Sequence, residues 1–175
     1  MRHSSAGSDG AGGIPPRDPV SGFQARISEL EQQLAQLRHS HEVEAARLSS
    51  VLEGTNAASW EWNVETGETV FNDRWAEMVG YTLAELEPVS IQTWSRLAHP
   101  DDLQESSRRL ARHFSHEEAL YDCECRMKHR DGHWVWVHDR GKVVEWNADG
   151  SPLRMAGTHT DITQRKLDEL RLRES

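Results

Sequence analysis

The stretch YDCECRMKHRDGHWVWVHDRG, residues 121–141, indicates the fold more directly than any other part of the chain. Its two halves alternate between apolar and polar residues with a period of two, as β-strands with one buried face do. The Asp-Gly pair at residues 131–132 is typical of a tight hairpin turn between two such strands. Val135 and Val137 should therefore share one face of the second strand, and larger side chains should share the other: Trp134, Trp136 and His138.

Shorter elements are predicted on the N-terminal side of this hairpin. Residues 60–64 alternate as a strand, residues 65–68 form a turn, and residues 69–71 form a second strand. Capping residues and helix breakers then predict a series of helices. Their expected positions are about 73–79, 82–86, 91–97 and, in a longer helix opened by His-Pro-Asp-Asp, 99–114.

The C-terminal side is simpler. A turn at residues 147–150 precedes a last strand at about 153–162, and residues 163–175 read as an exit helix. Antiparallel strands with the helices grouped on one side define the α+β class.

The N-terminal part differs in composition. Residues 1–21 are rich in Gly, Ser and Pro and are expected to form a disordered leader. Residues 22–52 carry apolar side chains in a 4-3-4-3 spacing, which favours a parallel dimeric coiled coil. A helix that packs on its own domain remains the alternative. The predicted seam contains Phe23, Ile27, Leu30, Leu34, Leu37 and, after a stutter, Leu48.

The overall composition excludes several classes of protein. The chain has 175 residues and a net charge of -9, which disfavours binding to the nucleic-acid backbone. No apolar run approaches the roughly 18 residues of a membrane span, and the N-terminus has no signal-peptide core. We therefore expect a cytoplasmic protein without nucleic-acid or membrane partners.

The two cysteines, Cys123 and Cys125, lie two positions apart on a predicted strand. Their side chains should project from the same face, which is poor disulfide geometry. We interpret them as small buried apolar residues. No metal site is predicted, because no further ligands are evident beside them in the sequence.

Four segments together resemble the PAS family, in the subgroup that carries the PAC motif. They are WEWNVETGETVFNDRWAEMVGYTLAEL (60–86), WSRLAHPDD (94–102), the hairpin at 121–141 and GTHTDITQRK (157–166). The resemblance covers about 110 residues and implies a PAS domain at 53–163. It implies a five-stranded antiparallel sheet of order 2-1-5-4-3 with short helices on one face, between an N-terminal coiled-coil helix and a C-terminal signalling helix at 164–175.

The resemblance also implies a function. PAS modules sense ligands, cofactors or redox state, or dimerise, and signal through flanking helices to a histidine kinase or a cyclic-dinucleotide enzyme. No nucleophile elbow, Walker loop, HExxH or paired CxxC motif occurs here, so the chain is not expected to be an enzyme. We expect an effector beyond Ser175 or in trans, as in two-component systems. The ending LRLRES within a predicted helix favours a fragment.

Two sets of residues are candidates for signalling. In the family, the Asp of an Asp-Ile-Thr signature ties the last strand to the domain body; here it is Asp161, with Arg140 as the suggested partner. Asp161 or Thr163 could instead cap the exit helix without a dynamic role. The dimer interface is expected on the helix seam or, across the outer sheet face, at Trp134 and Trp136.

The ligand is left open by the sequence. Trp75, Tyr81 and Trp94 could line a pocket for non-covalent flavin or a small metabolite, or these rings could simply fill the core. Covalent flavin chemistry is disfavoured, because residues 94–110 contain no Cys. Heme binding would require a histidine such as His99, His113 or His116, which we interpret as structural. The alternatives to a sensor of small ligands are a heme or flavin photo- or redox sensor and a ligand-free dimeriser.

Overall fold

The computed structural model describes residue 7, residues 12–13 and residues 18–175, so most of the predicted leader lies outside the described residues. The chain divides into two units, Met1–Leu48 and Ser49–Ser175. Within the described residues, no helix combines the length and the apolar character needed to cross a bilayer.

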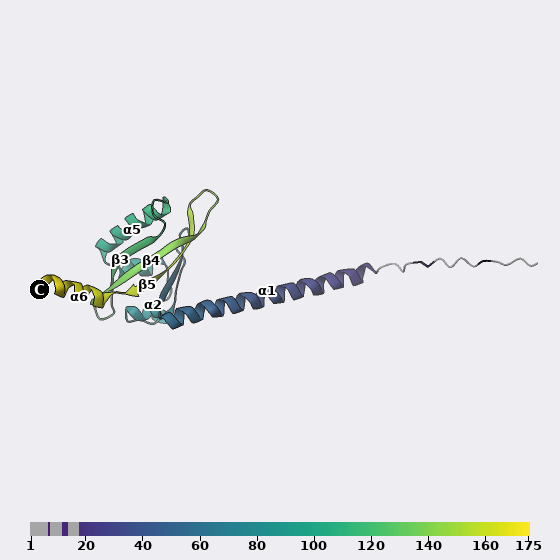
Figure 1. The fold of residues 1–175 in the computed structure, drawn as a ribbon, viewed down its shortest axis with the longest axis horizontal. Helices are drawn as coiled ribbons and strands as arrows, with labels where there is room; N and C mark the ends of the chain where they lie inside the picture. Colours follow the sequence, from purple (N-terminus) through teal and green to yellow (C-terminus); the bar gives the residue numbers. More distant parts are fainter. Residues whose placement is uncertain (1–6, 8–11, 14–17) are drawn as a thin grey trace, which may run out of the picture. The chain divides into compact units, whose positions relative to one another are not determined.

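A single helix, α1 (Pro19–Thr55), dominates the first unit (Figure 1). It begins where the side chain of Asp18 accepts a hydrogen bond from the Val20 amide at 3.0 Å. The predicted limits were residues 22 and 52, and the helix extends beyond both of them. The side chains of the predicted seam are between 46% and 70% exposed. Pairing of α1 with a second copy stays a prediction.

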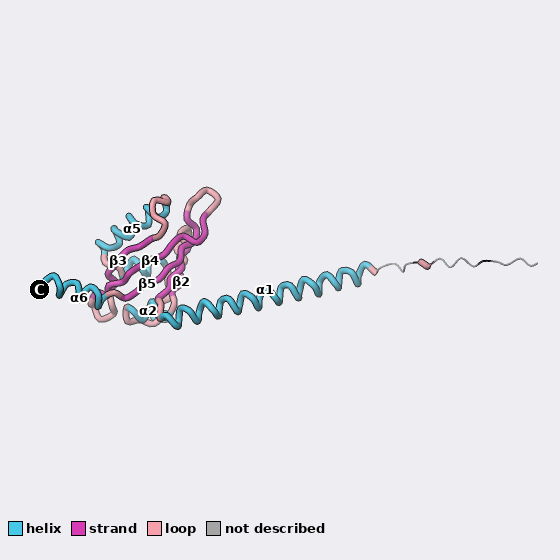
Figure 2. Tube along the Cα trace, in the orientation of Figure 1, coloured by secondary structure: helices cyan, strands magenta, loops and turns pink. Residues whose placement is uncertain are grey.

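The second unit contains a five-stranded antiparallel sheet of order β2-β1-β5-β4-β3, as predicted (Figures 1 and 2). Every pair of neighbouring strands in this sheet is antiparallel. The strands are β1 (Ala58–Asn63), β2 (Thr69–Phe71), β3 (Tyr121–Lys128), β4 (Trp134–Trp146) and β5 (Pro152–Asp161).

The connecting helices begin at the predicted capping residues. The Asn72 side chain accepts hydrogen bonds from the Trp75 and Ser59 amides, so it caps a helix and ties it to β1. Thr82 and Glu85 form a reciprocal capping box. The helices are α2 (Asp73–Met78), α3 (Leu83–Leu86), α4 (Ile91–Leu97), α5 (Pro100–Phe114) and, after the sheet, α6 (Thr163–Glu174).

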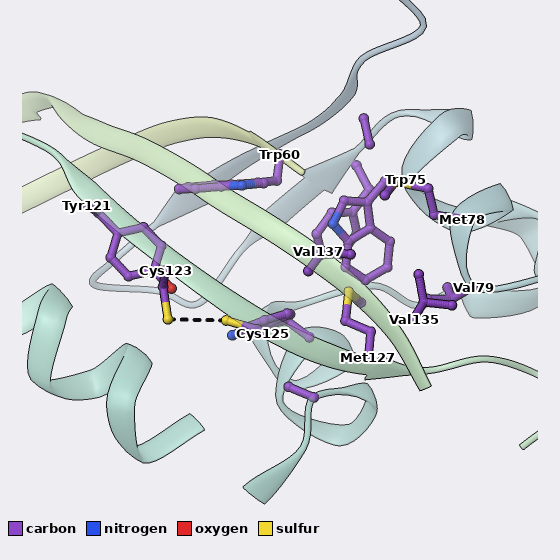
Figure 3. Packing of buried hydrophobic residues seen from close by; sticks show 14 of the residues in the cluster. Trp60, Trp75, Met78, Val79, Tyr121, Cys123, Cys125, Met127, Val135 and Val137 are labelled. Carbon is purple, nitrogen blue, oxygen red and sulfur yellow. Dashed lines mark hydrogen bonds between the residues drawn. The ribbon is translucent and has the colours of Figure 1, made fainter. Parts of the chain in front are cut away.

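The hairpin of β3 and β4 has the predicted turn, with Lys128 opposite Trp134 and Gly132 at φ +96°. Its inward side chains supply much of the core, and Figure 3 shows several of them in the buried cluster. The fully buried members include Trp75, Val79, Cys123, Cys125, Met127, Val137 and Met155. The predicted strand faces are therefore confirmed.

Two glycines make room for the Trp60 ring. Gly141 and Gly157 face each other across β4 and β5. A Cβ atom at either position would lie within 2.7 Å of the Trp60 ring. The indole consequently lies directly against the sheet and points toward β4.

Candidate functional site

A cavity of about 40 Å³ lies in the core of the second unit. The sheet contributes side chains from β1, β2, β3, β4 and β5, and the helices contribute Trp75, Ile91, Trp94, Ser106 and Leu110. A space of this size holds only a few water-sized groups. A larger ligand would therefore require the lining rings to move.

One side of the cavity is a buried polar network centred on Asp139. Its carboxylate accepts hydrogen bonds from Trp60 Nε1 at 2.9 Å and from the Tyr121 hydroxyl at 3.2 Å. His159 Nε2 lies 3.2 Å from the same carboxylate, and Ser106 Oγ lies 2.7 Å from the Tyr121 oxygen. All five side chains are at least nine-tenths buried, so each depends on the others for its polar contacts.

Burial, together with the adjacent Asp139 carboxylate, raises the pKa of Tyr121 far above its ordinary value. The phenol therefore stays neutral and keeps its proton for a hydrogen bond. The network presents fixed donors and acceptors to anything that enters the cavity.

Two indole groups on the cavity wall are unsatisfied. Trp62 Nε1 and Trp75 Nε1 are buried, and neither has a hydrogen-bond partner in the described part of the chain. Trp75 is only 1% exposed, and its ring stacks on Phe71 with 3.7 Å between centroids. A buried N–H without an acceptor costs about 1–3 kcal/mol. Two residues that line the cavity therefore carry unsatisfied hydrogen-bond donors.

The structure brings together only part of the predicted pocket. Trp75 and Trp94 line the cavity, and their ring centroids lie 5.7 and 5.3 Å from that of His159. Tyr81 does not line it, and its ring instead lies under the Arg130 guanidinium at 5.0 Å. The reason is Gly80, whose φ of +83° redirects the chain after α2.

The polar residues of the cavity were missed by sequence reasoning. Asp139 lies in phase with Val135 and Val137 on β4, so the alternation itself placed it on the inner face. A buried carboxylate requires hydrogen-bond or ionic partners, so the position of Asp139 on the inner face could have indicated a polar site. His159 gave no comparable signal, because its partner is brought to it only by the pairing of β5 with β4.

The histidines considered for heme are engaged elsewhere. Both ring nitrogens of His113 are used, one with the Glu118 carbonyl at 2.9 Å and one accepting from the Val143 amide at 2.9 Å. The His99 ring accepts from the Asp101 amide at 3.1 Å, at the start of α5. His116 lies against the Trp146 ring, with 4.4 Å between centroids.

The two cysteines share the inner face of β3, as predicted, and both are free thiols. Their sulfur atoms lie 3.3 Å apart (Figure 3). The hydrogen bond to Cys123 and burial raise the pKa of the Cys125 thiol. Cys125 is therefore a protonated core side chain.

The junction of β5 and α6 is tied to β4 by backbone and side-chain hydrogen bonds. The Thr163 hydroxyl accepts from the Trp136 amide at 3.0 Å, and the Ile162 amide donates to the Trp136 carbonyl at 2.9 Å. The Asp161 carboxylate accepts from the Thr163 amide at 2.9 Å, at the first turn of α6. Thr163, rather than Asp161, makes the side-chain link to the neighbouring strand.

The suggested pairing of Asp161 with Arg140 is wrong. Asp161 lies opposite Val137 in the β4–β5 register, three residues away from Arg140. Arg140 instead faces Asp122 directly across β3 and β4, and its Nε lies 3.0 Å from that carboxylate.

The two outer-face tryptophans have contacts within the chain. The Arg126 guanidinium and the Lys166 ammonium each lie 5.1 Å from the centre of the Trp136 ring. Trp134 lies 4.8 Å from Lys128 and 4.8 Å from the His99 ring. Lys166 also pairs with Glu124, and this hydrogen bond holds the pKa of that carboxyl below its usual value. The start of α6 thus contacts the outer face of the sheet.

Comparison with known proteins agrees with this architecture. A family model described as PAS fold matches residues 68–159, and the chain belongs to the PAS fold family. A crystal structure of a sensory box histidine kinase/response regulator from Burkholderia thailandensis is 35% identical, with a TM-score of 0.63. The match covers 73% of this chain and 92% of that one.

Two further relatives are similar over shorter or more distant matches. A hybrid signal transduction histidine kinase A of Dictyostelium discoideum is 38% identical over 74 residues, which are 41% of this chain and 3% of that protein. The N-terminal domain of a diguanylate cyclase with a PAS/PAC sensor from Marinobacter aquaeolei has a TM-score of 0.54 at 22% identity. That match covers 63% of this chain and 98% of the domain, and it shows a common fold.

Proposed function

We propose that this chain is the sensory module of a signal-transduction protein, in which the cavity binds a small ligand and α6 carries the signal to an effector. One observation carries the proposal. Strand β5 contributes His159 to the cavity wall, and α6 begins at Thr163, four residues later. A shift of His159 is therefore transmitted along a hydrogen-bonded strand to the first turn of the exit helix.

The chemistry of the ligand follows from the cavity. The unsatisfied donors Trp62 Nε1 and Trp75 Nε1 call for an acceptor atom, and the surrounding rings favour a compact planar group. Mass spectrometry of the molecule retained by the purified protein identifies such a ligand. A visible absorption band would instead favour the heme or flavin alternative.

The effector proposed is a histidine kinase or a cyclic-dinucleotide enzyme, in the same polypeptide or in trans. The names of the Burkholderia and Marinobacter relatives support these two classes. We also propose that the module works in the cytoplasm, the compartment expected from the sequence.

The signalling route is tested with the full chain fused to a reporter histidine kinase. Asp161→Ala removes the acceptor of the Thr163 amide at the start of α6, and we expect kinase output to change several-fold. Stability should fall by only about 1 kcal/mol, as for a lost helix cap. Asp149→Ala, which removes a similar local acceptor in the β4–β5 turn, is the matched control.

An unchanged output in Asp161→Ala, or a loss of output that merely follows unfolding in both variants, would contradict this route. Thermal melts of the two fusions separate these outcomes.

A further inference from the structure

The turn between β3 and β4 brings three metal-ligating side chains together, away from the cavity. They are His129, Asp131 and His133, and one ligand atom of each lies within 4.8 Å of the other two. The sequence led us to predict no metal site. The cluster went unnoticed because its members alternate with Arg130 and Gly132 in a segment that reads simply as a hairpin turn.

The backbone of the turn holds these side chains in place. The His129 amide donates to the His133 carbonyl at 2.8 Å, and the Gly132 amide donates to the His129 carbonyl at 2.8 Å. Gly132 adopts a φ of +96°, which closes the turn. The two imidazole rings are stacked, with 4.3 Å between centroids and 20° between planes, so one ring has to turn before both can bind the same ion.

The distance between His129 and Asp131 suits a small divalent ion. His129 Nδ1 lies 3.4 Å from Asp131 Oδ2, and it accepts a hydrogen bond from the Asp131 amide at 3.1 Å that a bound ion would replace. Two ligands of a tetrahedral zinc ion, each bound at about 2.0–2.2 Å, are about 3.3–3.5 Å apart. His133 is exposed, so its side chain can rotate toward the same point without disturbing the core.

The local charges also favour a cation. Asp131 supplies a carboxylate that is 71% exposed. The nearest cation in sequence, Arg130, turns its guanidinium to Glu85 at 2.7 Å and to the Tyr81 ring. Because this turn is exposed to solvent, water can occupy the remaining coordination position of the ion.

We propose that this turn is a binding site for a divalent transition-metal ion of the zinc class, held by His129, Asp131, His133 and water. Imidazole with carboxylate is a donor set that suits Zn²⁺, Ni²⁺ and Cu²⁺ and does not suit Mg²⁺.

Binding at this turn has a structural consequence. The His129 ring lies against Gly80, where a Cβ atom would come within 2.6 Å of it, and the Arg130 amide donates to the Val79 carbonyl at 2.9 Å. The ion therefore fastens the hairpin turn to the end of α2. Because the folded turn assembles the ligands, the ion raises the melting temperature.

The test is calorimetric titration of the full chain, freed of metal, with ZnCl₂. We expect one site per chain and a zinc-dependent rise in melting temperature. His133→Ala and Asp131→Asn should each raise the Kd at least about tenfold, since even indirect supports of metal sites contribute that much. Both residues are exposed, so melts without metal should match the wild type.

His138→Ala is the matched control. His138 and Asp122 form a pair at 2.7 Å that supplies only two side chains able to bind a metal ion. Its zinc affinity should equal that of the wild type. Absence of binding in the wild type overturns the proposal, as does wild-type affinity in His133→Ala. Loss of binding in His138→Ala alone would place the ion elsewhere and also overturn it.

Discussion

At the scale of single residues, Asp139 is the side chain on which the polar part of the core depends. Its two oxygens face three partners: Trp60, Tyr121 and His159. Asp139→Ala leaves these polar groups buried without their acceptor, and we expect it to lower the free energy of unfolding by about 3–5 kcal/mol. Urea denaturation measures the difference.

Asp139→Asn is the informative companion variant, because it keeps one carbonyl oxygen of similar position. We expect it to recover part of the loss. If Asp139→Ala lowers the free energy of unfolding by less than about 1 kcal/mol, the network does not stabilise the core as described above.

At the scale of elements, the ion pair of Asp102 and Arg126 joins the first turn of α5 to β3. The guanidinium donates to both carboxylate oxygens at 2.8 and 2.9 Å, and the Arg126 amide donates at 2.8 Å. Burial opposes ionisation of Asp102, but these hydrogen bonds outweigh it and hold the pKa of the carboxyl below its usual value.

A carboxyl whose pKa is lower in the folded state stabilises the fold above its unfolded pKa of about 3.9, and the stabilisation is lost as pH falls through the folded pKa. We therefore expect the wild type to lose more unfolding free energy between pH 6 and pH 3 than Asp102→Asn does. Chemical denaturation at the two pH values measures this. Equal losses in the two proteins would contradict the assignment.

At the scale of the whole molecule, the question is whether α1 pairs two copies of the chain. The double variant Leu34→Glu and Leu37→Glu places charges on the exposed seam and should dissociate the dimer. Sedimentation velocity measures the mass. Gln32→Glu with Gln36→Glu adds the same charge at outer heptad positions, and it should leave the dimer intact.

A dimer that survives the Leu34→Glu and Leu37→Glu changes would move the interface away from α1. The outer sheet face around Trp134 and Trp136 would then be the remaining candidate. Their contacts with Lys128 and Lys166 would have to rearrange for a second copy to reach the rings.

Local signals were sufficient for most of the fold. The caps at Asn72 and Thr82 and the turn at Gly132 depend on near neighbours in sequence, so they could be predicted. The inward faces of β3 and β4 followed from alternation alone. The resemblance to the PAS family supplied the order of the strands.

Fewer residues of the candidate sites could be predicted from the sequence. Trp75 and Trp94 were found, whereas Tyr81 was displaced by the positive φ of Gly80. Arg140 was suggested as the partner of Asp161 because it lies before Gly141 on the neighbouring strand, but the strand register places it opposite Asp122. Strand register depends on the whole sheet and cannot be derived from one strand.

The amino-acid sequence by itself determined the elements of this protein, because polarity patterns, caps and turns act between residues close in the chain. Only the tertiary structure decided the partners of the buried and charged side chains. Asp139 meets Trp60 across 79 residues, and Thr163 meets Trp136 across 27. Contacts at such separations arise when strands β1, β4 and β5 pair in one register, and that register is a property of the folded sheet.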